Sequence, residues 1–194
     1  MALRPQNHNA TTPIIMKQIA IDMDEVIARP NDRFIEWYAR DTGVKISEEI
    51  LFQEGKKFYQ YFGEEKGGPI REYLFHKGFF KDLPLMADCQ EVIRWLDQHY
   101  EIFFVTAAME FRNSMEDKYD WLQQYFPFIS WRQYVFCGRK DMISTDYLID
   151  DHVSNLISFR GKGILFHAPH NLEDTKFTRV RNWREVRSFF EKEL

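Results

Sequence analysis

The chain has few cysteines: Cys89 and Cys137 are the only two among its 194 residues. Their separation is not that of a metal-binding pair, and each lies within or beside an apolar segment. Free cysteine is one of the most buried residue types, so we expect both to be small buried side chains. This usage favours a reduced, cytoplasmic protein.

Long apolar runs are also missing. No stretch of about eighteen apolar residues occurs, and residues 1–15 lack the continuous apolar segment of a signal peptide. We therefore expect no membrane-spanning segment and a cytoplasmic location. Residues 1–15 are interpreted as a loose N-terminal leader, and Met16 is itself a candidate start.

A strong charge of one sign is absent too. The sequence has 26 Lys and Arg against 30 Asp and Glu, which gives a formal net charge of −4. Such a surface has no general attraction to nucleic-acid phosphates or anionic membranes, whereas a small anionic substrate remains compatible with it.

What the chain does contain is an alternation of short apolar runs with amphipathic helical patterns, typical of strand and helix units around a parallel sheet. Its length fits one core with a modest insertion. We predict an α/β fold with a Rossmann-like three-layer core and a parallel sheet of about five strands. The candidate strands are residues 17–22, 101–106, 133–137, 146–150 and 163–167.

Helices with readable ends lie between these strands. Asp88 is a candidate cap with Glu91 reaching back, and Asn182 is a candidate cap of the last helix. The side chains expected to pack on the sheet recur at helical spacing: Val92, Ile93 and Leu96; Met115, Tyr119 and Leu122; and Val186, Phe189 and Phe190.

Residues 30–83 break the alternation and read as several short helices rich in Phe and Tyr, the first ending at Gly43. We interpret this segment as a helical cap inserted after the first strand, over a core formed by residues 16–29 and 84–194. Ligands of open α/β sheets bind beyond the carboxyl ends of the strands, so such a cap would cover the ligand crevice.

Polar residues follow the carboxyl ends of three predicted strands. Asp22 and Asp24 follow the first, Thr106 ends the second, and Asp150 with Asp151 ends the fourth. Lys140 lies in the connection before the fourth strand. Taken singly each residue is more simply explained as a turn, strand or surface residue, but in a parallel sheet they meet at one edge.

Crowded carboxylates at this edge need a cation, and Mg²⁺ prefers carboxylates, waters and phosphate oxygens as ligands. The set indicates phosphoryl transfer through an aspartyl-phosphate.

The ordered motifs "IAIDMDEV", "FFVTAA", Lys140 and "YLIDDHVSN" resemble the four motifs of the haloacid dehalogenase superfamily of phosphatases. The stretch from "EDKYDWLQQYFPF" to "GRKDMISTDYLIDDHVSN" is similar to the 5'(3')-deoxyribonucleotidase family, as are "GILFHAPHN" and "RVRNWREV". The resemblance covers nearly the whole chain from Met16 and points to the bacterial members.

This resemblance implies a role for each site residue. Asp22 would be the nucleophile, and Asp24 would be the general acid and then the general base. Mg²⁺ would be held by the Asp22 side chain, the Asp24 backbone carbonyl and Asp151, with Asp150 behind them or sharing the role. Thr106, the Ala107 amide and Lys140 would bind the phosphoryl oxygens.

The sequence differs from the family's mammalian members at four positions of the site. Those members have Gly, Phe, Ser and Arg at the positions of Glu25, Pro30, Ala107 and His152. Glu25, Pro30 and His152 are therefore the candidate substrate-binding residues. Aromatic residues of the cap could stack on a base or form the cap's own core: Phe34, Trp37, Tyr38, Phe58 and Tyr61. His8, His76, His99, His167 and His170 show no ligand spacing, so no zinc site is expected.

The leading hypothesis is thus a Mg²⁺-dependent phosphomonoesterase that hydrolyses nucleoside monophosphates. The alternatives are a phosphatase of the same fold for another small phosphate, such as a sugar phosphate, or a non-catalytic phosphate-binding protein. Asp24 argues against the last, because binding alone needs no positioned proton donor. Oligomeric state is left open, with a homodimer as one option.

Overall fold

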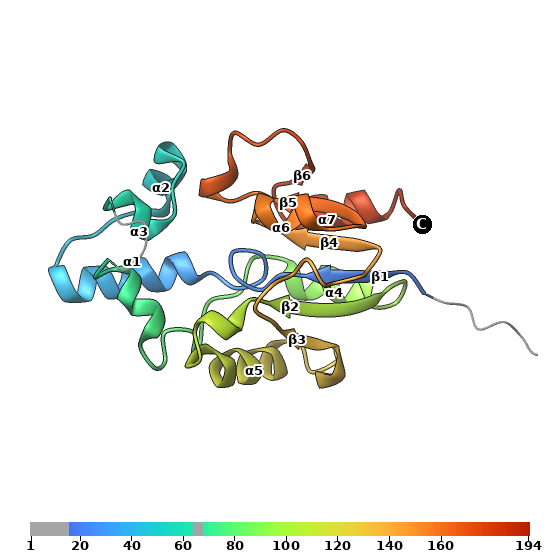
Figure 1. Cartoon of the computed structure of the whole chain (residues 1–194), viewed down its shortest axis with the longest axis horizontal. Coiled ribbons are helices and arrows are strands. Elements are labelled where there is room, and N and C mark those ends of the chain that lie inside the picture. The colour runs from blue at the N-terminus through green and yellow to red at the C-terminus, as the bar shows by residue number, and fades with distance from the viewer. Residues whose placement is uncertain (1–15, 64–67) are drawn as a thin grey trace, which may run out of the picture.

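The computed structural model describes residues 16–63 and 68–194, so the proposed leader at residues 1–15 lies outside it. A parallel sheet of six strands in the order β3-β2-β1-β4-β5-β6 forms the centre of the molecule (Figure 1). The strands are β1 Gln18–Ile21, β2 Glu101–Thr106, β3 Tyr134–Phe136, β4 Tyr147–Asp150, β5 Lys162–Phe166 and β6 Thr178–Val180.

The predicted α/β class with a parallel sheet is confirmed, but the count of about five strands was too low by one. The strand that was missed, β6, has three residues, of which only Val180 is buried. It pairs with β5 at the edge of the sheet. So short a run with one buried side chain carries little of the apolar pattern by which strands are recognised in a sequence.

Helices cover the sheet and continue beyond one of its ends (Figure 1). The α-helices are α1 Pro30–Thr42, α2 Glu48–Glu54, α3 Phe58–Tyr61, α4 Cys89–Leu96, α5 Ser114–Tyr125, α6 Val153–Ser158 and α7 Trp183–Phe190. Short 3₁₀-helices occur at η1 Arg71–Phe75, η2 Ala108–Glu110, η3 Trp131–Gln133 and η4 Pro169–Asn171. Within the described ranges, no helix has the length and apolar character needed to cross a membrane.

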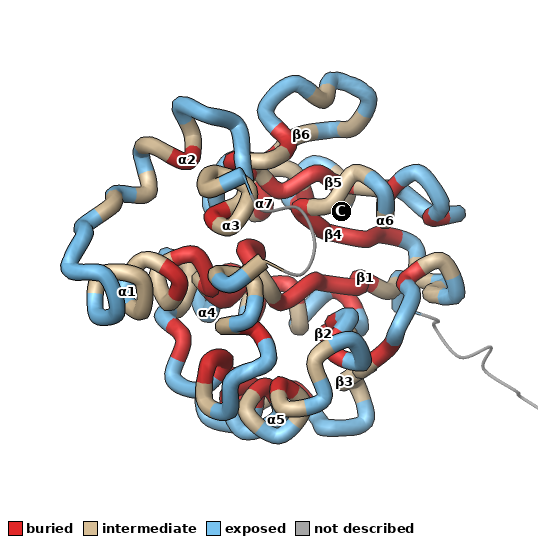
Figure 2. The backbone as a smooth tube through the Cα atoms, turned by 60° about the vertical axis from the view of Figure 1, so that its left-hand side comes forward, coloured by how far each residue is buried: buried red, intermediate tan, exposed pale blue. Residues whose placement is uncertain are grey.

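The two faces of the sheet bury separate sets of side chains, because successive residues of a strand point to opposite faces. In β1, Ile19 and Ile21 join the larger cluster, to which α4, α5 and α7 contribute, whereas Ala20 joins the smaller cluster with α6. Figure 2 shows the buried residues concentrated along the central strands. The core is therefore three-layered, as predicted.

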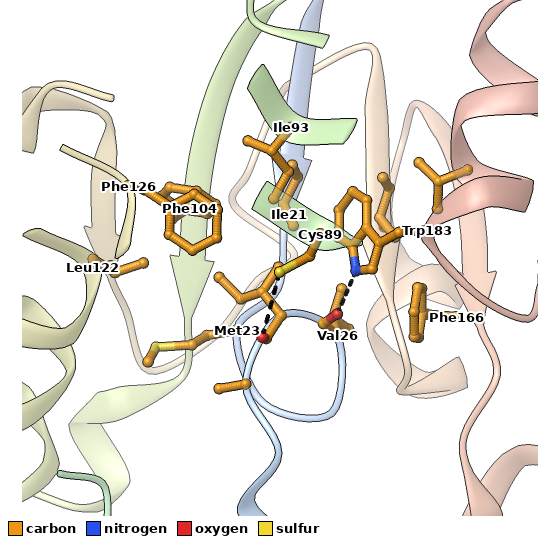
Figure 3. Packing of buried hydrophobic residues seen from close by; sticks show 14 of the residues in the cluster. Ile21, Met23, Val26, Cys89, Ile93, Phe104, Leu122, Phe126, Phe166 and Trp183 are labelled. Carbon is orange, nitrogen blue, oxygen red and sulfur yellow. Dashed lines mark hydrogen bonds between the residues drawn. The ribbon is translucent and has the colours of Figure 1, made fainter. Parts of the chain in front are cut away.

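The larger cluster also contains the loop that follows β1 (Figure 3). Trp183 of α7 is fully buried and its indole Nε1 donates to the Val26 carbonyl over 2.8 Å. The Cys89 thiol lies 3.9 Å from the Ile27 carbonyl. Both cysteines are free and buried, as expected. The loop carrying Asp24 is thus packed against two helices from distant parts of the chain.

Residues 30–83 form α1, α2, α3 and η1, beyond the carboxyl ends of the strands (Figure 1). In the described part of this segment there is no strand, as predicted. α1 ends where expected, with Gly43 in the left-handed conformation at φ 74° and its N–H donating to the Ala39 carbonyl. Glycine adopts that conformation without the cost that a β-carbon imposes.

Two expectations about helix residues were wrong. Asp88 precedes α4 but makes no side-chain capping bond, and its carboxylate instead pairs with Arg184 at 2.7 Å. In α5 the buried residues are Ser114, Lys118, Trp121 and Leu122, whereas Tyr119 is exposed and Met115 only half-buried. Asn182 does cap α7, accepting from the Glu185 N–H over 3.0 Å.

Candidate active site

The predicted site residues meet at the carboxyl edge of the sheet. β1 lies between β2 and β4, so Asp22, Thr106 and Asp150 extend from three adjacent strands. β2 and β3 lie on one side of β1, and β4, β5 and β6 lie on the other. Where the strand order reverses in this way, a crevice forms outside the carboxyl ends of the strands. Parallel order alone therefore gathers residues 84 and 128 positions apart in the sequence, as 106 − 22 and 150 − 22 give.

Lys140 links two of the aspartates. Its Nζ lies 2.5 Å from Asp22 Oδ1 and 2.7 Å from Asp150 Oδ2, and its side chain is 3% exposed. Burial alone would lower the pKa of Lys140, but the two carboxylates outweigh burial and raise that pKa above its usual value. The lysine is therefore a permanent positive charge beside Asp22.

Asp150 and Asp151 have different surroundings, although they are neighbours in the sequence. Both Asp150 oxygens are occupied, by Lys140, the Asn155 side-chain amide and the His152 N–H. Asp151 is equally buried, yet its Oδ1 has no hydrogen-bond partner in the described part of the chain. Asp151 is thus the one of the pair with an oxygen left for a ligand.

The residues fit a hard divalent cation. Carboxylate oxygens of Asp22, Asp150 and Asp151 lie within 4.8 Å of one another. Burial raises the pKa of Asp22 well above its ordinary value, and the neighbouring carboxylates add to this effect against the opposing pull of Lys140. A divalent ion coordinated by oxygen would relieve that crowding. Asp22 and Asp151 are the side chains free to coordinate it.

Lys118 is a site residue that the sequence prediction missed. Its side chain is 1% exposed, and its Nζ lies 2.5 Å from Asp24 Oδ2 and 2.9 Å from Thr106 Oγ1. The ammonium also lies 4.6 Å from the centre of the Phe80 ring. A signal was present, because a lysine at position 118 falls on the same helical stripe as Ser114 and Trp121.

A pocket of about 310 Å³ opens beside these residues and extends toward the helices of residues 30–83. Eight of the predicted site residues line it: Asp22, Asp24, Glu25, Pro30, Ala107, Lys140, Asp151 and His152. Thr106 and Asp150 are buried behind the lining, at 1% and 0% exposure. Their side chains act on the pocket through Lys118 and Lys140, which they contact directly.

Some aromatic residues of the 30–83 segment line the pocket, and others pack within the segment. Phe34, Phe58 and Tyr59 line the pocket. Trp37, Tyr38 and Tyr61 are not in that lining, as far as the structure describes the chain, and pack on other rings of the same segment, such as Phe79, Phe58 and Phe62. Phe34 also stacks on Phe58, with ring centres 5.5 Å apart, so part of the wall is also part of the segment's own core.

Glu25 occupies an unusual position for a charged residue. Its backbone is left-handed at φ 58°, its side chain is buried, and one carboxylate oxygen accepts from the Asn31 N–H at the start of α1 over 2.8 Å. Burial raises the pKa of Glu25 well above its ordinary value. Glu25 therefore connects the loop carrying Asp24 to the first helix beyond the sheet.

His152 and His170 lie together beside Asp151. The sequence indicated His152, but not His170, as a candidate site residue. The Nε2 atoms of His170 and His152 lie 3.1 Å and 3.9 Å from Asp151 Oδ2. The Nζ of Lys57, from the segment between α2 and α3, lies 2.7 Å from His152 Nε2. These side chains all line the pocket.

Comparison with known proteins places the chain in a family. The sequence model of the family "5' nucleotidase, deoxy (Pyrimidine), cytosolic type C protein" matches residues 15–193. The chain belongs to this family of phosphate-monoester hydrolases. A Bacillus subtilis relative named 5'(3')-deoxyribonucleotidase is 37% identical over 174 residues, covering 88% of this chain and 96% of the relative. A Staphylococcus epidermidis protein, provisionally given the same name, is 42% identical over 174 residues, covering 90% and 96%.

Solved structures agree on the fold. A haloacid dehalogenase-like family protein from Streptococcus pneumoniae has a TM-score of 0.58 at 12% identity, covering 90% of this chain and 98% of its own. A hydrolase of the same superfamily from Bacillus subtilis, solved with bound magnesium, has a TM-score of 0.56 at 13% identity, covering 91% and 99%. At this identity the likeness concerns the haloacid dehalogenase fold, and the predicted roles of the individual residues stay predictions.

Proposed function

We propose that this protein is a Mg²⁺-dependent phosphomonoesterase that hydrolyses nucleoside monophosphates through an aspartyl-phosphate on Asp22. The observation that carries the proposal is the buried Asp22–Lys140–Asp150 arrangement, of which Asp22 and Lys140 line the pocket, with Asp24 and Lys118 beside it. It supplies a nucleophile, a fixed positive charge and a carboxylate for proton transfer within one site.

In the first step, an Asp22 carboxylate oxygen attacks phosphorus while Lys140 holds a phosphoryl oxygen on the same side. Asp24 protonates the departing ester oxygen and later takes a proton from the water that hydrolyses the aspartyl-phosphate. Lys118 fixes Asp24 through Oδ2 and leaves Oδ1 without a partner among the described residues. Asp24 Oδ1 is thus the atom that exchanges the proton. The Ala107 amide binds a phosphoryl oxygen, whereas the buried Thr106 hydroxyl, which accepts from Lys118, acts through that lysine.

The metal would be held by Asp22, Asp151 and the backbone carbonyl of Asp24, where it would neutralise the carboxylates and polarise the phosphoryl group. Asp150 would then act on Lys140 rather than on the metal, because all its acceptor positions are already used.

Residues 30–83 would serve as a cap over the 16–29 and 84–194 core. The aromatic wall of Phe34, Phe58 and Tyr59 offers apolar faces on which a base can stack. The name of the Bacillus subtilis relative supports a deoxyribonucleotide as substrate. A cytoplasmic location, supported by the family's description, is part of the same proposal.

A panel of monophosphates tests the proposal. Nucleoside 5'- and 3'-monophosphates and sugar phosphates are compared by kcat/KM with Mg²⁺ and with a chelator. We expect the highest kcat/KM for a nucleoside monophosphate and no turnover after chelation. A preference for a sugar phosphate would favour the alternative phosphatase, and tight phosphate binding without turnover on any substrate would favour the non-catalytic protein.

The nucleophile is tested in the same assay with Asp22→Asn. Hydrolysis of a generic phosphomonoester should be abolished while circular dichroism shows an intact fold. Retained turnover in this variant would exclude Asp22 as the nucleophile.

A further inference from the structure

Two imidazoles lie beside Oδ2 of Asp151. One nitrogen each of His152 and His170 and one oxygen of Asp151 lie within 4.8 Å of one another. Two ligands of a tetrahedral ion at about 2.1 Å from it lie about 3.4 Å apart, which compares with the observed 3.1 Å and 3.9 Å from the two Nε2 atoms to Asp151 Oδ2. Two nitrogens and one carboxylate oxygen are the ligands of a borderline transition metal rather than of Mg²⁺.

From this arrangement we propose a second divalent-cation site, formed by Asp151, His152 and His170, that takes Zn²⁺ or a similar transition metal. Its metal would use Asp151 Oδ2, whereas the site proposed for Mg²⁺ has Asp151 Oδ1 available. The proposal concerns metal binding alone and does not depend on the phosphatase activity.

The site is held in place before any metal binds. His170 belongs to η4, and its neighbour Asn171 donates from Nδ2 to the carbonyls of Asp151 and Phe166, each over 2.8 Å. Asn171 is 4% exposed, and its Oδ1 accepts from Arg179 over 2.6 Å. The buried amide thus fixes η4 beside the end of β4, which keeps the His170 ring next to the Asp151 carboxylate.

Two further observations indicate a cation at this position. His170 Nε2 is buried and makes no hydrogen bond to the described residues, although it lies close to Asp151 Oδ2. The ammonium of Lys57 already lies against His152 Nε2 at 2.7 Å. A metal would compete with that ammonium, and the 37% exposure of the His152 side chain leaves an approach from the pocket.

The location predicts an effect on the pocket. The three ligands and Lys57 all line the cavity that holds Asp22 and Asp24. A metal on Asp151 Oδ2 would draw charge from a carboxylate proposed to hold Mg²⁺, and would release Lys57 from His152. If the proposed phosphatase activity holds, Zn²⁺ bound here should also inhibit it in the presence of excess Mg²⁺, because the two sites share Asp151.

Metal binding to the full chain tests the site. Zn²⁺ is titrated against a chromophoric chelator with Mg²⁺ in excess, for the wild type, His152→Ala, His170→Ala and, as a matched control, His99→Ala in the exposed turn after α4. We expect one Zn²⁺ per chain, at least about tenfold weaker binding in the first two variants, and unchanged binding in the control. Lys57→Met should bind Zn²⁺ more tightly, because the competing ammonium is gone.

Co²⁺ provides a second measurement that does not depend on turnover. Tetrahedral nitrogen and oxygen ligation should give intense visible bands in the wild type that are lost in His152→Ala. Equal Zn²⁺ affinity of the wild type and the three histidine variants would overturn the proposal. So would a loss of Zn²⁺ binding that occurs only in Asp22→Asn, or sulfur-to-metal charge-transfer bands that show Cys137 as a ligand. Thermal melting checks the fold of each variant; if His170→Ala unfolds, the partly exposed His152 decides the outcome.

Discussion

At the scale of single residues, Lys118 is the clearest case of a side chain whose role depends on three-dimensional contacts. It is buried between Asp24 and Thr106, from a helix that the sequence marks only as amphipathic. Lys118→Met keeps the length of the side chain and removes its charge. We expect kcat to fall by about 10²-fold, because Asp24 loses the group that fixes its orientation for proton transfer.

The control for Lys118→Met is Lys162→Met, which removes an exposed pair with Glu193 far from the pocket. It should leave kcat unchanged. Equal activity of Lys118→Met and wild type, with both folded, would show that Asp24 does not need this lysine.

The thiol of Cys89 gives a prediction about pH. Burial raises its pKa from 9.0 to about 12. The folded protein therefore keeps the proton at a pH where the unfolded chain has released it, so stability is unaffected below about pH 9 and falls above it, by up to about 1.4 kcal/mol per pH unit. Cys89→Ala should lose stability less steeply between pH 9 and 11 than wild type, in urea unfolding. Parallel pH curves for the two proteins would contradict this.

Most of the acidic cluster could be predicted from the sequence because Asp22, Thr106 and Asp150 stand where strands end, and parallel strands bring their ends together. The different surroundings of Asp150 and Asp151 could not be predicted, because they depend on Asn155 and on a histidine in a distant turn, His170. Side-chain contacts of that kind are set by loops, which leave no periodic pattern in a sequence.

At the scale of elements, α7 supports the loop that carries Asp24. Trp183 is fully buried and its indole donates to the carbonyl of Val26. Trp183→Phe removes the donor and leaves that carbonyl unpaired, which should lower the free energy of unfolding by about 1–3 kcal/mol. Trp131→Phe is the matched control, since Trp131 is 60% exposed and its loss should change stability by less than about 0.5 kcal/mol. Urea unfolding that gives equal losses for both would contradict the structural role of Trp183.

The elements that could be predicted from the sequence are those whose apolar residues recur at a regular spacing. α4 and α7 follow their apolar spacing, and α1 ends at Gly43 as expected. The errors lie where a tertiary contact replaced a local one: Asp88 pairs with Arg184 rather than capping α4, and α5 is rotated so that Lys118, not Tyr119, faces inward.

At the scale of the whole molecule, the order of the strands explains where the site lies. With β1 between β2 and β4, the crevice opens beside Asp22, and residues 30–83 leave the sheet at the same edge (Figure 1). The segment proposed as a cap is thus covalently attached next to Asp22, the proposed nucleophile. Glu25, bonded to the Asn31 N–H, joins the two parts at that attachment.

The most direct test of the account is the covalent state of Asp22 during turnover. Asp24→Asn is mixed with Mg²⁺ and an aryl phosphate, whose leaving group departs without a proton, and is then quenched in acid for peptide mass spectrometry. We predict one phosphoryl group on the peptide that contains Asp22, because hydrolysis of the aspartyl-phosphate needs the missing base. A phosphoryl group on another residue, or turnover by the wild type with no phosphorylated peptide trapped in the variant, would contradict the account.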